Sequence, residues 1–157
     1  MDIVEMRKCS SILIAVIGIA LLAFVICNLF EVTDGTNDNY ENWCEYYQVS
    51  IESNPVRCYD NYVYEQTVGL DKCYHMLVEV HATKSTVKKK RLLNEMTKTL
   101  EDLNDKSNAY LSAVTNNKEL LDAVSEDLYQ NSLDKIKEFS GEMFRLIVDV
   151  DNIKRSL

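Results

Sequence analysis

Residues 93–128 read LNEMTKTLEDLNDKSNAYLSAVTNNKELLDAVSEDL, and this stretch decides the fold. Its apolar residues recur in alternating steps of three and four, the spacing that places side chains on one face of an α-helix. The positions that follow this spacing are Leu93, Met96, Leu100, Leu103, Ser107, Tyr110, Val114, Asn117, Leu121, Val124 and Leu128. Only Ser107 and Asn117 are polar, so the stretch predicts a long amphipathic helix with one buried seam.

The same spacing returns nearer the C-terminus. It covers Ile136, Phe139, Met143, Leu146, Val150, Ile153 and Leu157. The whole chain of 157 residues contains one proline and four glycines. Sandwiches and barrels need many turn residues, so this composition favours an all-α protein.

Two architectures are compatible with the gap of eight residues between Leu128 and Ile136. The gap can be a stutter in one extended parallel coiled coil. Alternatively, residues 129–132 form a tight connection with Ser132 as the N-cap of a second helix, so that helices over 72–129 and 133–156 pack as a hairpin or bundle. Further apolar residues off the seam widen the stripe and favour the bundle. These residues are Leu92, Leu111, Leu120, Leu133 and Ile147.

Residues 12–30 read ILIAVIGIALLAFVICNLF and contain no charged side chain. As a helix this run is about 28 Å long, close to the thickness of a bilayer's hydrocarbon core. Arg7 and Lys8 precede the run, whereas the residues after it are acidic. The positive-inside rule then predicts a type II signal-anchor, with residues 1–11 as a cytoplasmic tail and the C-terminus extracellular or lumenal.

A cleaved signal peptide is the alternative to the anchor, with Val25-Ile26-Cys27 as the cleavage point. In that case the protein is a secreted helical factor or effector. If the anchor is retained, Cys9 lies just inside the membrane surface and is a candidate for acylation.

Residues 31–72 form an acidic, tyrosine-rich segment, which precedes the predicted helical ectodomain at residues 73–157. Residues 28–70 carry eight acidic side chains and one basic one, a net charge of −7 within a total of −8. Such a surface repels phosphate groups, so nucleic acid is not an expected partner. The membrane is expected as a partner only through residues 12–30.

Three cysteines, Cys44, Cys58 and Cys73, are the candidates for disulfide bonds in an oxidising compartment. A disulfide bond between two of them is expected to hold the segment together. The spacing of the three cysteines does not decide which two are paired. Because three is an odd number, one thiol is left for a bridge between chains, which predicts a homodimer. The spacing of these cysteines lacks the close pairs that structural zinc sites use, so no metal is expected.

Aromatic side chains are concentrated in the same segment. Seven of the nine tyrosines and the only tryptophan lie within residues 40–74. Tyrosine and tryptophan dominate binding hot spots, so the segment is the predicted contact surface. The alternative is that these rings fill a core. The candidate interaction residues are Trp43, Tyr46, Tyr47, Tyr59, Tyr62 and Tyr64.

The sequence contains none of the common motifs for nucleophilic, zinc-dependent or phosphate-binding chemistry. No catalytic residue and no cofactor is therefore predicted. The one basic run, KKKR at residues 88–91, is interpreted as a solvated helix face rather than as a heparan-binding or processing site. The expected function is adhesion, tethering or receptor and ligand binding by a non-catalytic membrane protein.

Overall fold

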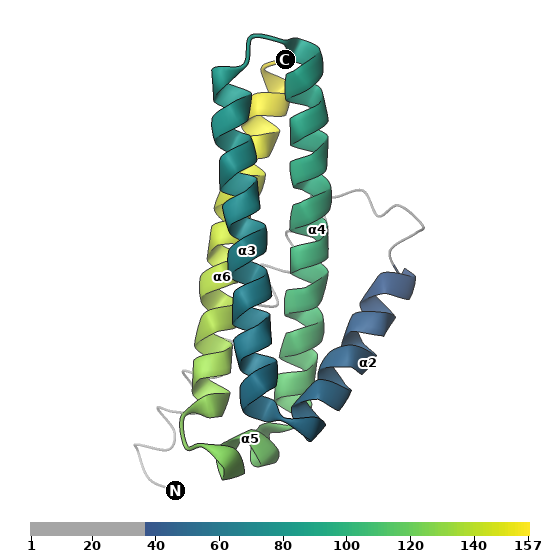
Figure 1. Cartoon of the computed structure of the whole chain (residues 1–157), viewed down its shortest axis with the longest axis vertical. Helices are drawn as coiled ribbons and strands as arrows, with labels where there is room; N and C mark the ends of the chain where they lie inside the picture. The colour runs from purple at the N-terminus through teal and green to yellow at the C-terminus, as the bar shows by residue number, and fades with distance from the viewer. Residues whose placement is uncertain (1–36) are drawn as a thin grey trace, which may run out of the picture. The chain divides into compact units, whose positions relative to one another are not determined.

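The computed structural model describes residues 37–157, which are almost entirely helical and contain no strand (Figure 1). This confirms the all-α prediction for that part of the chain. The helices are α2 (Asn37–Ser53), α3 (Pro55–Ala82), α4 (Thr86–Asn116), α5 (Lys118–Val124) and α6 (Leu128–Arg155). None of these helices is long and apolar enough to cross a membrane. The predicted tail at 1–11, the predicted span at 12–30 and Cys9 lie outside the described residues.

A proline and its neighbour separate α2 from α3. Asn54 has an extended backbone, and its side-chain oxygen accepts a hydrogen bond of 3.0 Å from the amide of Arg57. Pro55 has no amide hydrogen and disfavours helical geometry in the residue before it, so it ends one helix and begins the next. Beyond this corner α2 leans away from α3 and packs mainly against α4 (Figure 1).

The connection between α3 and α4 reverses the chain. The amide of Thr83 donates to the carbonyl of Glu79 at 3.0 Å, and the Ser85 hydroxyl accepts from the amide of Lys88 at 3.3 Å. These two bonds satisfy groups that a helix end leaves open. The prediction of one helix over residues 72–129 is therefore wrong, and so is the extended coiled coil. The chain instead forms an antiparallel helical bundle, as the alternative predicted.

The second reversal comes earlier than predicted. α4 ends at Asn116, α5 makes two turns, and Ser125 to Asp127 lead into α6. Ser132, expected as an N-cap, is a buried residue inside α6 whose hydroxyl bonds the carbonyl of Leu128 at 2.8 Å. The connection predicted at residues 129–132 lies instead at residues 125–127, about one helical turn earlier.

The core follows the predicted seam closely. Eight of the eleven positions in the first seam are buried apolar residues, namely Leu93, Met96, Leu100, Leu103, Tyr110, Val114, Leu121 and Leu128. Val124 is exposed because it lies on the outer side of the short helix α5. α4 is the central helix and contacts α2, α3 and α6. Where α3 meets α4, Gly69 lies directly against the side chain of Leu103.

No disulfide joins the cysteines of the described residues: Cys44, Cys58 and Cys73 are free thiols. Cys58 and Cys73 both belong to α3, where fifteen residues span about 22 Å. A disulfide needs Cα atoms within about 7 Å, so this pairing is excluded. Residues 37–72 belong to α2 and α3, and α3 continues through residue 72 to Ala82.

Candidate interaction surface

Four aromatic rings from four helices form the centre of the bundle. Tyr62 of α3 and Tyr110 of α4 stack with centroids 4.0 Å apart and planes 19° apart. Tyr47 of α2 meets both rings edge-on, and Phe139 of α6 meets Tyr62 edge-on at 5.9 Å. Tyr47 and Tyr62 are almost completely buried. These two candidates therefore follow the alternative given for the aromatic segment, in which the rings fill a core.

The buried tyrosine hydroxyls are paired with serines. The Tyr62 hydroxyl lies 3.0 Å from the Ser107 oxygen, and the Tyr110 hydroxyl lies 3.1 Å from the Ser132 oxygen. Burial raises the pKa of both tyrosines, so both stay protonated at physiological pH. Ser107, one of the two polar residues in the predicted seam, thus provides the partner that the buried Tyr62 hydroxyl needs.

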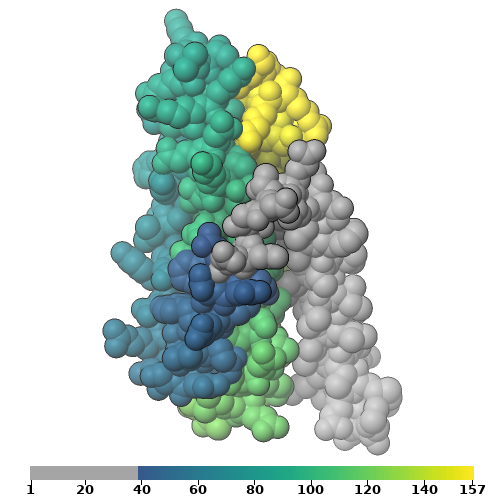
Figure 2. All heavy atoms as spheres, turned by 90° about the vertical axis from the view of Figure 1, so that its right-hand side faces the viewer, coloured from purple at the N-terminus to yellow at the C-terminus, as the bar shows by residue number. Residues whose placement is uncertain are grey.

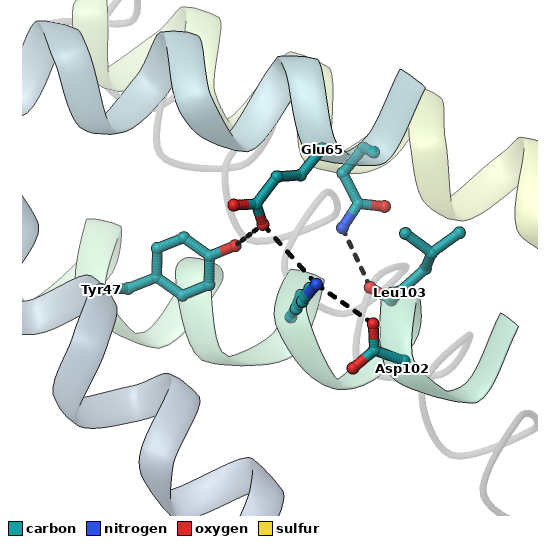
Figure 3. Close-up of polar contacts among 6 residues, drawn as sticks. Tyr47, Glu65, Asp102 and Leu103 are labelled. Atoms are coloured by element: carbon teal, nitrogen blue, oxygen red, sulfur yellow. Dashed lines mark hydrogen bonds and ion pairs between the residues drawn. The ribbon is translucent and has the colours of Figure 1, made fainter. Parts of the chain in front are cut away.

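A second polar network connects this core to the surface. The Tyr47 hydroxyl donates to a Glu65 carboxylate oxygen at 3.4 Å, and the Lys106 ammonium lies 3.7 Å from the same oxygen (Figure 3). Lys106 also pairs with Asp102 at 3.1 Å and lies 4.4 Å from the centre of the Trp43 ring. Lys106 of α4 thus contacts Glu65 of α3 and Trp43 of α2, and it holds the Trp43 indole against the bundle.

The exposed aromatic side chains of α2 lie outside this network. Tyr46 is 40% exposed, and its ring meets Trp43 edge-on at 5.8 Å and Tyr47 at 5.1 Å. Val49, one turn further, is 59% exposed. We refer to Trp43, Tyr46 and Val49 as the α2 face, which belongs to the helix at the front of Figure 2. Trp43 is half-buried, so the face has a fixed base and an exposed edge.

The two remaining interaction candidates lie on α3. Tyr59 is half-buried, and Tyr64 is 70% exposed. Neither ring pairs with an aromatic ring of α2 among the described residues. The structure therefore brings Trp43 and Tyr46 together and places Tyr59 and Tyr64 elsewhere.

A groove continues the α2 face around the corner between α2 and α3. It has a volume of about 410 Å³ and is lined by Val49, Ser50, Ser53, Asn54, Arg57, Cys58 and Asn61. Arg57 is the only basic residue in the acidic segment 28–70. The corner groove thus offers one cation, several polar groups and one apolar side chain. This mixture suits a polypeptide partner that contributes a carboxylate, because guanidinium binds carboxylates in a planar pair.

The three thiols differ in access. Cys58 and Cys73 are buried, and burial raises their pKa to about 12 and about 11. A buried, protonated thiol reacts slowly, since the thiolate is the reactive form. Cys44 of α2 is half-buried and is the only one of the three with appreciable access to solvent.

Asp105 makes the stability of the bundle depend on pH. Burial raises its pKa from 3.8 to about 6, with smaller contributions from Asp102 and Glu101. A carboxyl whose pKa is higher in the folded state destabilises the fold above that pKa, and the penalty disappears as the pH falls toward 3.8.

We expect Asp105→Asn to stabilise the protein by about 1 kcal/mol at pH near 7.5, after allowance for solvent screening, and to have almost no effect near pH 4. Thermal unfolding of the two proteins across this pH range measures the difference. Asp71→Asn, at an exposed position of α3, is the control. A difference between wild type and Asp105→Asn that does not change with pH contradicts the assignment.

Tyr110 and Phe139 were placed on the predicted buried seams, but sequence reasoning missed Lys106, which supports Trp43 of the α2 face from α4. The signal of Lys106 was ambiguous, because a lysine in a helix is usually solvated. Among the described residues, no group of three His, Cys, Asp or Glu side chains is arranged to hold a metal ion. Neither a protein-family model nor a curated protein nor a solved structure matches this chain.

Proposed function

We propose that the protein is a non-catalytic, single-pass type II membrane protein whose helical bundle binds a protein partner outside the cytoplasm. Residues 12–30 are the anchor, and the function is adhesion, tethering or receptor and ligand binding. The observation that carries the proposal is the α2 face, where Trp43 and Tyr46 sit at the surface on a rigid base. Large aromatic side chains at a surface are typical of binding hot spots.

Preorganisation supports this assignment of the surface. Lys106 and Tyr47 hold Trp43 from below, and the edge contact with Trp43 restrains Tyr46. A partner that binds here orders few side chains, which lowers the entropic cost of association. The adjoining corner groove, with Arg57, adds a polar rim that can set orientation.

The combined substitution Tyr46→Glu and Val49→Glu tests the surface without disturbing the core, because both side chains are exposed. We expect cells that display the full chain with these changes to adhere to untransfected cells at least about tenfold less than cells with the wild-type chain. The matched control is Val68→Glu with Val78→Glu on the exposed side of α3. Equal adhesion by the α2 variant and the control removes the α2 face from the proposal.

The proposed dimer is assigned to Cys44, since the other two thiols are buried. In an oxidising compartment, two Cys44 thiols lose two protons and two electrons to a disulfide oxidant and form one bond between chains. We expect Cys44→Ser to abolish the dimer seen on non-reducing gels, whereas Cys58→Ser and Cys73→Ser retain it. A reductant-sensitive dimer that persists in Cys44→Ser contradicts the assignment.

A secreted helical factor is the second candidate, and one observation favours it. The compact unit spans Gly35–Leu157 and therefore begins after the proposed cleavage point at Cys27. The released chain would retain every described helix. Recovery of a shortened chain from culture medium, with none in the membrane pellet, would replace the anchored protein by the secreted one.

A further inference from the structure

The two ends of the bundle carry opposite charge. The basic end consists of residues 81–91, at the connection between α3 and α4, and residues 152–157, at the end of α6. The chain brings these segments together although they are far apart in sequence, and both lie at the top of Figures 1 and 2. They contain seven lysines and arginines and no acidic residue. Seven of the seventeen basic residues of the chain are therefore at one end.

The acidic end lies at the opposite pole and consists of residues 52–60 and 117–128. It contains six acidic residues and two basic ones. Its main element is α5, which connects α4 to α6 (Figure 1). Leu121 of α5 is buried, but Leu120 and Val124 are 36% and 47% exposed. Glu119, Asp122, Glu126 and Asp127 surround these two apolar side chains in sequence.

The basic end has a groove of complementary character. An open hollow of about 260 Å³ between α4 and α6 is lined by Lys90, Leu93, Asn94, Lys154 and Leu157. Its lysines come from two helices. Leu157, which is 42% exposed, gives it one apolar wall, whereas Leu93 belongs to the buried core beneath it. Lys154 donates to the Thr97 hydroxyl at 2.8 Å, which leaves its charge without a carboxylate partner in the described part of the chain. Elsewhere at this end, Lys88 pairs with Glu79 and Arg155 with Asp151.

We propose that this groove, between α4 and α6 at the basic end, binds α5 of a second copy of the chain. In this contact the lysines of the groove face the carboxylates of α5, and the exposed Leu157 packs against Leu120 and Val124. The two sites lie at opposite ends of one bundle, so they cannot meet within one molecule. The groove lies between α4 and α6, and α5 connects the same two helices. Two antiparallel copies placed side by side can therefore each insert α5 into the groove of the other, and the two contacts close a dimer.

A second copy fits this groove better than a polyanion does. A sulfated polysaccharide or a nucleic acid backbone would use the lysines but would leave the exposed Leu157 without an apolar partner. An acidic helix with exposed apolar side chains uses both. This contact is non-covalent and does not depend on the proposed Cys44 bridge or on the α2 face.

Charge reversal tests the contact on the full chain, kept soluble in mild detergent and in the presence of reductant. One variant reverses the charge of the groove, Lys90→Glu with Lys154→Glu. The other reverses the charge of α5 and of the connection that follows it, Glu119→Lys with Glu126→Lys. All four side chains are exposed, so the fold does not depend on them. Lys98→Glu with Lys137→Glu, at exposed positions in the middle of α4 and α6, is the matched control.

Sedimentation velocity measures the association. We expect the wild type and the control to dimerise, with weaker association as salt rises from about 50 mM to about 500 mM. Each reversed variant alone should dissociate at least about tenfold more readily, and an equal mixture of the two should recover the dimer, because both contacts are again between opposite charges. A wild type that stays monomeric overturns the proposal, and so does a mixture that fails to recover. If the wild type stays monomeric but binds heparin through Lys90 and Lys154, the groove belongs to a polyanion.

Discussion

Replacing Tyr62 with alanine is expected to destabilise the bundle by about 4 kcal/mol, enough to unfold most small domains partly at 37 °C. Tyr62 is fully buried, stacks on Tyr110 and contacts Phe139. Alanine leaves a cavity at the meeting point of the four main helices. It also leaves the Ser107 hydroxyl without the partner that lies 3.0 Å away.

Urea unfolding followed by circular dichroism measures this loss, with two variants as reference points. Tyr62→Phe keeps the ring and removes only the hydroxyl, so it should cost about 1 kcal/mol. Tyr64→Ala removes a tyrosine from an exposed position of the same helix and should change stability by less than about 0.5 kcal/mol. Equal losses for Tyr62→Ala and Tyr64→Ala would contradict the central aromatic cluster.

The second large effect is expected at Gly69, where α3 packs directly against Leu103 of α4. A Cβ atom at this position would lie 2.5 Å from one methyl carbon of Leu103, 2.8 Å from the other and 3.1 Å from Cγ. Leu103 is itself buried, so its whole side chain must move into an occupied core. We expect Gly69→Ala to destabilise the protein by about 2 kcal/mol through overpacking, despite the better helix propensity of alanine.

Gly141 provides the matched comparison. It also lies inside a long helix, α6, but an added Cβ would meet no atom within 4 Å. Gly141→Ala should therefore stabilise the protein by about 1 kcal/mol, as helix propensity alone predicts. The two substitutions should shift the urea midpoint in opposite directions. A shift in the same direction at both sites would contradict the close packing of α3 on α4.

Hydrophobic spacing predicted the buried face of α4 and α6 because side chains at steps of three and four share one side of a helix. The spacing did not predict the chain reversal at Thr83 to Ser85. Apolar spacing shows which face of a helix is buried, but it does not show where the chain leaves one helix and turns back in the next. The local signals were capping residues. Ser85 before α4 and Asn54 followed by Pro55 before α3 are ordinary helix start signals, which hydrophobic spacing alone does not detect.

The candidate surface was only partly predictable for a geometric reason. Tyr46 and Tyr47 are adjacent, yet successive residues of a helix point about 100° apart, so one faces solvent and the other the core. Which of the two is buried depends on Tyr62 and Tyr110, which belong to helices that composition cannot place. The neighbours of the basic run at residues 88–91 were unpredictable for the same reason. They are residues 154–155, which lie at the C-terminal end of α6 and are far away in the sequence.

The proposed function depends most on two conditions: the bundle lies outside the cytoplasm, and its anchor stays in the membrane. Lys154→Thr creates an Asn-Ile-Thr acceptor for N-glycosylation at Asn152, an exposed residue in a chain that has no such acceptor of its own. The same substitution in a chain whose residues 1–30 are replaced by a cleavable signal peptide establishes that the acceptor is competent. We expect alkaline-washed membranes to retain the full chain as a band that an endoglycosidase shifts. An unmodified band, or a protein washed off the membranes, would contradict the proposal.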